Sequence, residues 1–231
     1  MQAYAIVIKD HEVSETGYNN LKASSEKFKN SFKIRRFDAI LPKMARTVMS
    51  GNGLKWKYPW EGKETDLKTG LIKSAYQTAN KNTRIACALS HWLLWHKCLT
   101  EDTPLLILEH DALFIEKLEH SVILKSKFDI IGINSPAAAT RKAHEFHDKV
   151  QAGRLLIQPV PTVDEFNVPQ GLAGNSAYII KPAGAKSILD AAREHGLWPN
   201  DALMCKQIIP NLGVTKTYYT RVQGLPSTTV S

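Results

Sequence analysis

The sequence has few of the features that mark secreted, membrane-spanning or repetitive proteins. Only three of its 231 residues are cysteine, Cys87, Cys98 and Cys205, and an odd number cannot pair completely within one chain. No apolar run approaches the ~18 residues that a membrane-spanning helix needs. The start, Met1–Ile8, has neither the cationic region nor the apolar length of a signal peptide. We therefore expect free thiols and a cytoplasmic location, with no transmembrane segment.

Internal repeats, heptads and Gly/Ser-rich linkers are also missing. With 43% hydrophobic and 23% charged residues, the composition excludes collagen-like, low-complexity and disordered chains. A chain of this length and composition can bury one sizeable core. The sequence predicts a single domain over residues 1–231.

Acidic residues are scarce in the first third of the chain. Residues 1–84 hold 16 basic and 8 acidic side chains, whereas residues 85–231 hold 14 of each, so the first third accounts for the whole formal net charge of +8. A surplus confined to one region points to a local anionic partner.

The pattern that is present is typical of an α/β protein, since short apolar runs alternate with helical periodicity. We expect a mostly parallel central sheet with helices on both faces. Between residues 41 and 82 lies a long stretch rich in Gly, Lys, Trp and Tyr, which predicts a basic, loop-rich functional insertion. Strands are expected at residues 4–8, 34–37, 104–108, 128–133, 155–158, 177–180 and, as an edge strand, 214–219, and helices at 14–28 with Ser14 as N-cap, 84–99, 182–193 and 200–209.

Two acids follow a buried strand. The run Leu105–Leu108 continues into Glu109, His110 and Asp111. Residues two apart on a strand share a face, so we expect Glu109 and Asp111 to point together and His110 to point away. Ligands of open α/β sheets bind beyond the carboxyl ends of strands. A hard divalent cation there would offset the repulsion between the carboxylates and bridge a diphosphate. The alternative is a solvated strand exit without chemistry.

The expected helix at 84–99 carries polar Ser90 and His91 within an apolar pattern. Cys87, His91 and Cys98 fall on one stripe of such a helix, which leaves a zinc site open although no fourth ligand is evident. Buried free thiols and a hydrogen-bonded histidine are the plainer interpretation.

Four blocks in order resemble glycosyltransferase family 25, the family of lipo-oligosaccharide galactosyltransferases and the procollagen galactosyltransferase domain. They extend over about residues 83–205. The blocks are Ala86-Cys87-Ala88-Leu89-Ser90-His91, Leu108-Glu109-His110-Asp111, Gly174-Asn175-Ser176-Ala177-Tyr178 with the Lys181-Pro182-Ala183-Gly184-Ala185 helix start, and Pro199-Asn200-Asp201-Ala202-Leu203.

The resemblance implies a GT-A-like fold, a nucleotide-sugar donor, a divalent metal (Mn²⁺ or Mg²⁺) and an inverting transfer. It places the metal on Asp111, with Glu109 as a second ligand, and the general base on Asp201, an acid that alternatively only caps a helix. His110 stands where the family usually has an acid. The donor-binding residues expected from the matching blocks and the first strand end are Ile8, Lys9, Ser90, His91, Glu109, Asp111, Gly174 and Asn175.

The basic insertion is the candidate acceptor site. Lys55, Trp56, Lys57, Tyr58 and Trp60 alternate cations with aromatic rings, and such a segment suits phosphates together with bases or sugars. Two acceptors fit: a hydroxymethylated base in DNA of a phage-infected cell, which the interleaving slightly favours, or an anionic lipo-oligosaccharide at the inner face of a bacterial membrane. The alternative without a binding role is a solvated lysine-rich loop whose aromatic side chains pack locally.

A hypothesis of another class is a basic nucleic-acid-binding protein that keeps the fold without the chemistry, because His110 lowers the charge of the acidic motif. Several motif blocks preserved together favour the enzyme. The sequence leaves open the donor sugar, the acceptor, a strict need for metal and the oligomeric state.

Overall fold

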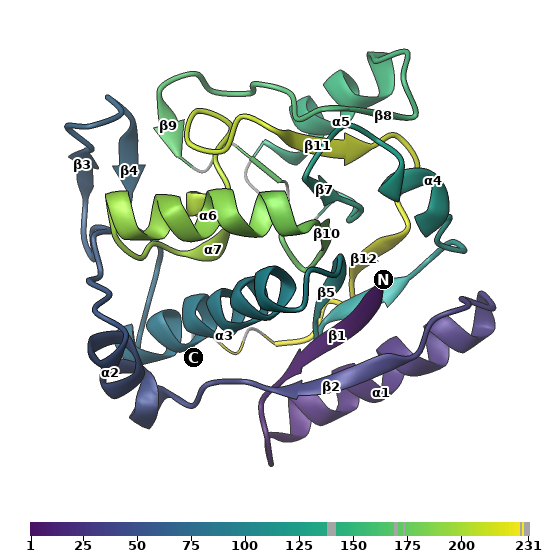
Figure 1. The fold of residues 1–231 in the computed structure, drawn as a ribbon, viewed down its shortest axis with the longest axis horizontal. Coiled ribbons are helices and arrows are strands. Elements are labelled where there is room, and N and C mark those ends of the chain that lie inside the picture. Colours follow the sequence, from purple (N-terminus) through teal and green to yellow (C-terminus); the bar gives the residue numbers. More distant parts are fainter. Residues whose placement is uncertain (138–141, 169–170, 173, 227, 229–231) are drawn as a thin grey trace.

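The computed structural model describes residues 1–231 except 138–141, 169–170, 173, 227 and 229–231. Its centre is a seven-stranded sheet in the order β2-β1-β5-β10-β7-β11-β8, with helices on both faces (Figure 1). The strands of this sheet are β1 (Gln2–Val7), β2 (Ile34–Asp38), β5 (Leu105–Glu109), β7 (Ile130–Gly132), β8 (Ile157–Pro159), β10 (Ala177–Ile180) and β11 (Leu212–Thr215). The α/β class predicted from the alternating pattern is confirmed.

The sheet is mixed. β2, β1 and β5 are parallel neighbours, as are β7 and β11, but β10 runs antiparallel to both of its neighbours and β8 runs antiparallel to β11. Five strands therefore share one direction, and half of the pairings are antiparallel. The apolar runs of β5 and β10 are buried throughout, which is why they read as continuous rather than alternating.

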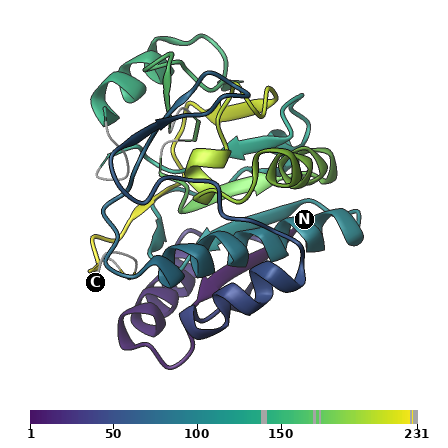
Figure 2. The same cartoon turned by 90° about the vertical axis from the view of Figure 1, so that its left-hand side faces the viewer.

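Alternate residues of the strands supply two cores. Tyr4, Leu105 and Ile107 face a core completed by several helices, while Ala5 and Leu106 face a second one with α1. α3 packs between α2 and α6 on the first face (Figures 1 and 2). The helices are α1 (Glu12–Lys27), α2 (Pro42–Gly51), α3 (Lys81–Thr100), α4 (His120–Leu124), α5 (Ala143–Ala152), α6 (Pro182–His195) and α7 (Asn200–Leu203).

Two small sheets complete the structure. β3 (Lys63–Thr65) and β4 (Ile72–Ser74) form a hairpin that pairs with β9 (Asn167–Val168). β6 (Ala112–Phe114) follows the acidic turn and pairs with β12 (Thr220–Val222). Among the described residues, no helix is long and apolar enough to cross a membrane.

The structure corrects several expected elements. The stretch 41–82 is not irregular, since it holds α2, β3 and β4. Ser14 does not cap α1: the N-cap is His11, and Ser14 Oγ instead accepts a hydrogen bond from the amide of Ile8 at 2.9 Å. α7 ends at Leu203, far short of the expected end at residue 209. The strand expected at 214–219 is β11, which is internal because β8 pairs beyond it.

Candidate active site

The carboxyl ends of β1, β2 and β5 meet at one edge of the sheet, since Ile6 pairs with Glu109 and Val7 with Asp38 in parallel register. A cavity of about 280 Å³ lies at this edge. Its walls come from the ends of these strands and from one side of α3. Among the expected donor-binding residues, Ile8, Ser90, His91 and Glu109 line it, together with His110, Cys87 and His11.

Ser90 fixes one wall of this cavity. Its hydroxyl donates to the carbonyl of Ala86 at 2.8 Å and accepts from the amide of Ile40 at 2.9 Å. The segment after β2 is thereby tied to α3, and fully buried Ser90 acts on the cavity through its shape. Lys9 is exposed and does not line the cavity within the described part of the chain.

Glu109 is held by a chain of buried hydrogen bonds. His91 Nε2 lies 3.1 Å from Glu109 Oε1, and because an ionised carboxylate only accepts, Nε2 carries the proton. His91 Nδ1 lies 2.9 Å from the Tyr178 hydroxyl, which also accepts from Trp95 Nε1 at 2.8 Å. Burial raises the pKa of Glu109, but the His91 hydrogen bond and nearby positive charge outweigh it and lower the pKa. Glu109 is thus fixed as a carboxylate.

Asp111 differs from Glu109 in having a free oxygen. Its Oδ1 is buried and has no hydrogen-bond partner among the described residues. Burial and the nearby charge of Glu109 raise the pKa of Asp111 to about 7, against a smaller lowering by the Ser176 hydroxyl. The charge of Glu109 acts on Asp111, so the two acids lie near each other. Asp111 stands in the turn after β5, however, and is not among the described residues that line the cavity, whereas His110, which was expected to point away, lines it with Glu109. His110 does not point into solvent: it is 9% exposed, and burial lowers its pKa.

The turn that carries Asp111 is braced from outside. Gln223 donates its backbone N–H to the Asp111 carbonyl at 2.8 Å, and its Nε2 lies 3.1 Å from the carbonyl of His110. Gly17 of α1 permits a close approach, since a Cβ there would lie 2.7 Å from that same carbonyl. These contacts, remote in sequence, fix the direction of the acidic turn.

The third matching block enters the site from β10. Gly174 has a φ of 60°, which suits glycine, and the next residues turn into the strand. Ser176 accepts the Glu109 N–H on its carbonyl at 2.8 Å. Asn175 is 6% exposed, its Nδ2 lies 3.2 Å from Met204 Sδ, and its Oδ1 is buried without a partner among the described residues.

Asp201 lies on α7 beside the same acids. The Tyr76 hydroxyl donates to its Oδ2 at 3.0 Å, and its Oδ1 accepts from the amide of Ala202 at 3.0 Å. Burial raises the pKa of Asp201; Tyr76 and Arg84 lower it, and Glu109 raises it. The N-cap of α7 is Pro199, so Asp201 does not serve as the capping residue.

Arg84 brings a positive charge to the acids, and sequence reasoning missed it as a site residue. It stands in the first turn of α3, and its charge lowers the pKa of both Glu109 and Asp201. Its guanidinium carbon lies 5.1 Å from the centre of the Tyr76 ring, and Nη2 donates to the carbonyl of Gln77 at 3.1 Å. Its Nε is buried with no acceptor in the described chain.

The structure does not support the zinc site of Cys87, His91 and Cys98 that the sequence left open. Cys98 is not part of the group, because its Sγ donates to the carbonyls of Thr103 and Ile180 inside the core. The ligand atoms of Cys87, His91 and Glu109 do lie within 4.8 Å of one another. Both ring nitrogens of His91 are already engaged, however, and burial raises the pKa of the Cys87 thiol, which disfavours the thiolate that binds zinc.

The alternating segment of the basic insertion divides into two sides. Lys55 and Lys57 are exposed. Tyr58 is only 4% exposed and stacks on Tyr76, so little of its own surface is open to an acceptor. Trp56 and Trp60 are half-buried and stack on each other at 4.8 Å. These rings pack among themselves, and together with Lys57 they line a pocket of about 480 Å³.

A family model described as glycosyltransferase family 25 (LPS biosynthesis protein) matches residues 19–204. The match spans most of the chain and includes all four motif blocks. It defines the class of the protein, which is a glycosyltransferase. The chain belongs to glycosyltransferase family 25, as its motifs indicate.

Solved structures of another glycosyltransferase are also similar. A crystal structure of an active-site mutant of LgtC matches with a TM-score of 0.46 and 10% identity, over 98% of this chain and 88% of that one. The galactosyltransferase LgtC in complex with donor and acceptor sugar analogues matches with a TM-score of 0.41 and 9% identity, over 93% and 73%. No curated protein matches the chain by sequence.

Proposed function

We infer that the protein transfers a sugar from a nucleotide-sugar donor to an acceptor hydroxyl with inversion at the anomeric carbon. The nucleotide occupies the cavity of about 280 Å³ at the carboxyl ends of β1, β2 and β5. This position suits the inference because ligands of α/β sheets bind beyond the carboxyl ends of the strands.

The observation that carries the inference is the buried, unpartnered Oδ1 of Asp111 beside the fixed carboxylate of Glu109. A buried carboxylate oxygen without a donor is costly unless a ligand satisfies it. Arg84, whose charge acts on Glu109, also has a buried Nε without a partner among the described residues, and so does Asn175 at Oδ1. Unsatisfied buried atoms of both signs are what a site for a cation and an anionic ligand would contain.

These residues fit the divalent cation that the family implies. Asp111 would hold it through Oδ1, with Glu109 as a second hard oxygen ligand, and Mn²⁺ or Mg²⁺ both suit carboxylate oxygens. When bound, the cation neutralises charge on the departing nucleoside diphosphate. His91 keeps Glu109 ionised and oriented, and Arg84 supplies a fixed positive charge for the phosphates.

Asp201 is the proposed general base. The acceptor hydroxyl attacks the anomeric carbon as its proton passes to the Asp201 carboxylate, and the bond from that carbon to the diphosphate oxygen breaks with its electron pair leaving on the diphosphate. Burial raises the pKa of Asp201, which strengthens it as a base, and Tyr76 orients it. One displacement from the opposite side inverts the anomeric configuration.

A saccharide is the acceptor that we favour. The preference for a hydroxymethylated DNA base drew on the aromatic rings of the insertion, and those rings are stacked on one another or buried. The exposed lysines still suit an anionic acceptor such as a lipo-oligosaccharide. DNA remains the alternative that the experiment must separate.

The test is a screen of nucleotide sugars with Mn²⁺ or Mg²⁺ against oligosaccharides and hydroxymethylated DNA, read as a mass gain of one sugar. We expect a gain on oligosaccharide alone, an inverted anomer by NMR, and a loss of about 100-fold in turnover for Asp111→Asn. Asp148→Asn, which removes an exposed acid of α5, is the matched control. A mass gain on DNA alone would show that DNA, not a saccharide, is the acceptor. An absence of turnover with every donor would support the non-catalytic nucleic-acid-binding alternative.

A further inference from the structure

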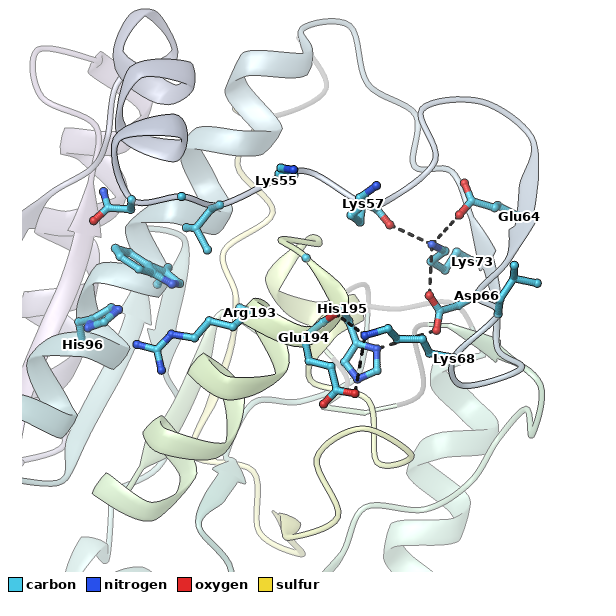
Figure 3. A pocket seen from close by; sticks show the side chains of 17 residues that line it. Lys55, Lys57, Glu64, Asp66, Lys68, Lys73, His96, Arg193, Glu194 and His195 are labelled. Carbon is cyan, nitrogen blue, oxygen red and sulfur yellow. Dashed lines mark hydrogen bonds and ion pairs between the residues drawn. The ribbon is translucent and has the colours of Figure 1, made fainter.

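A second and larger cavity, of about 640 Å³, lies outside the site described above (Figure 3). It is enclosed by residues 52–57, by the β3–β4 hairpin and by the end of α6, with Trp92 and His96 of α3 at its base. Trp198, Tyr58 and Tyr76 contact one another in turn, and the Tyr76 hydroxyl reaches Asp201. Among the described residues, this cavity shares no lining residue with the first one and is therefore not part of the donor site.

The charged residues that line this cavity leave it with a positive excess. Five are Lys or Arg and three are Asp or Glu. Two of the acids, Glu64 and Asp66, form ion pairs with the buried Lys73. Its Nζ lies 2.7 Å from Glu64 Oε1 and 3.7 Å from Asp66 Oδ1. The third, Glu194, lies 3.8 Å from Lys68 Nζ. Each acid therefore has a lysine partner, with Lys73 shared between two of them.

Lys55 and Lys57 are the cations left over. Neither ammonium group has a hydrogen bond or ion pair within the described part of the chain, and both are held at the cavity by their backbone. The amide of Lys57 donates to the carbonyl of Leu197 at 3.1 Å, and the amide of Leu197 donates to the carbonyl of Lys55 at 2.8 Å. Gly196, with a φ of 86°, leaves room for the Lys57 stem, since a Cβ there would lie 2.4 Å from Lys57 Cγ. Two charges are thus presented without a partner.

Two buried histidine nitrogens point to a missing ligand. His195 Nδ1 is buried and has no hydrogen-bond partner among the described residues, and its side chain is only 10% exposed. Its nearest acid is Asp66, at 4.0 Å, beyond hydrogen-bond distance. His96 Nε2, on the opposite wall, is likewise buried without a partner there. Figure 3 shows His195 beside Lys68 and Glu194, with Arg193 reaching toward His96.

The size of the cavity and the rest of its lining describe the body of the ligand. The volume falls in the range of small-molecule sites and far exceeds what an inorganic anion fills. Leu54, Trp92 and Ala192 contribute apolar groups, and the unpartnered nitrogens of His195 and His96 can form hydrogen bonds. A ligand with a polar, uncharged body and one oxyanion group matches this combination.

We propose that this cavity binds a saccharide bearing a phosphate or carboxylate group, with the anion at Lys55 and Lys57 and the sugar body against His195 and Trp92. The identification of the body as a saccharide rests on the proposed function. Lysine ammonium groups bind such oxyanions as point charges. The cavity then selects acceptors by an anionic group away from the reacting hydroxyl, which gives the basic surplus of the first third a specific role.

The test is calorimetric titration of the whole protein with hexose 6-phosphate, a hexuronic acid, the neutral hexose and inorganic phosphate, at low and moderate salt. Lys55→Gln with Lys57→Gln removes both free charges, and His195→Asn probes the buried nitrogen separately. Lys33→Gln is the matched control, since Lys33 is an exposed lysine of the same basic third at the opposite end of β2. Thermal melting checks that each variant folds.

We expect the hexose phosphate or the hexuronic acid to bind at least about 10-fold more tightly than the neutral hexose, with weaker binding at higher salt. Kd should rise at least about 10-fold in the double lysine variant, as expected for loss of charge-assisted bonds, and remain unchanged in Lys33→Gln. Binding should also persist in Asp111→Asn, which separates this result from failure of the transfer reaction.

Three results would overturn the proposal. The first is equal binding of the neutral hexose, and the second is a Kd in the double lysine variant within twofold of the parent. The third is inorganic phosphate binding as tightly as hexose phosphate, which would make free phosphate rather than a saccharide the ligand.

Discussion

The Tyr76 hydroxyl donates a hydrogen bond to Asp201 Oδ2 at 3.0 Å, although the two residues are 125 positions apart. Tyr76 lies just after β4 in the basic insertion, and Asp201 lies on α7. The insertion is therefore bound to the proposed general base. This contact connects the basic insertion to one of the four family motifs.

That hydrogen bond predicts the pH dependence of transfer. Burial raises the pKa of Asp201 and the Tyr76 hydrogen bond lowers it. Because the bond stabilises the ionised base, Tyr76→Phe should raise this pKa and move the acidic limb of the kcat/KM profile to higher pH. Activity at high pH should change much less. An unmoved limb in the variant would contradict the assignment of the base.

Arg84 should determine donor affinity. Its Nε is buried without an acceptor, and its charge acts on Glu109 and Asp201. Arg84→Gln should raise KM for the nucleotide sugar by about 10-fold or more, the effect of losing a hydrogen bond to a charged group. Arg154→Gln, which removes an exposed arginine after α5 that lines neither cavity, is the control. Equal KM values in the two variants would show that Arg84 does not contact the donor.

Tyr178 should contribute more to stability than its single hydroxyl suggests. In Tyr178→Phe, His91 Nδ1 and Trp95 Nε1 both lose their partner inside the core. Two buried polar groups left unsatisfied should cost about 2–6 kcal/mol in the free energy of unfolding. Denaturant unfolding measures this cost, with Tyr18→Phe on α1 as the control, expected within ~0.5 kcal/mol of the parent. A loss below 1 kcal/mol in Tyr178→Phe would show that the chain of hydrogen bonds is not maintained.

The sequence predicted the parts of the fold that local pattern determines. Runs such as 104–108 and 177–180 are buried on both faces, so composition alone marks them as strands. α2 was missed although its apolar residues recur at helical spacing, because it was read together with the glycine- and lysine-rich residues that follow it as one loop-rich stretch. The reversed direction of β10 has no local signal, since strand pairing is a property of the whole sheet.

The candidate site divides in the same way. Glu109, Asp111 and Asp201 could be proposed because their motifs are contiguous, and in the structure the charge of Glu109 acts on both of the others. Tyr76 and Gln223 were missed because each acts across more than 100 residues on a carboxylate or a carbonyl. The burial of Tyr58 was not foreseen, because alternation along an extended segment turns its ring inward while Lys55 and Lys57 face solvent.

Direct titration of Mn²⁺ into the protein, followed by electron paramagnetic resonance, tests whether the unpartnered Oδ1 of Asp111 binds a cation. We expect one bound Mn²⁺ per chain, its loss in Asp111→Asn and its retention in Asp148→Asn. Undiminished stoichiometric binding in Asp111→Asn would contradict it.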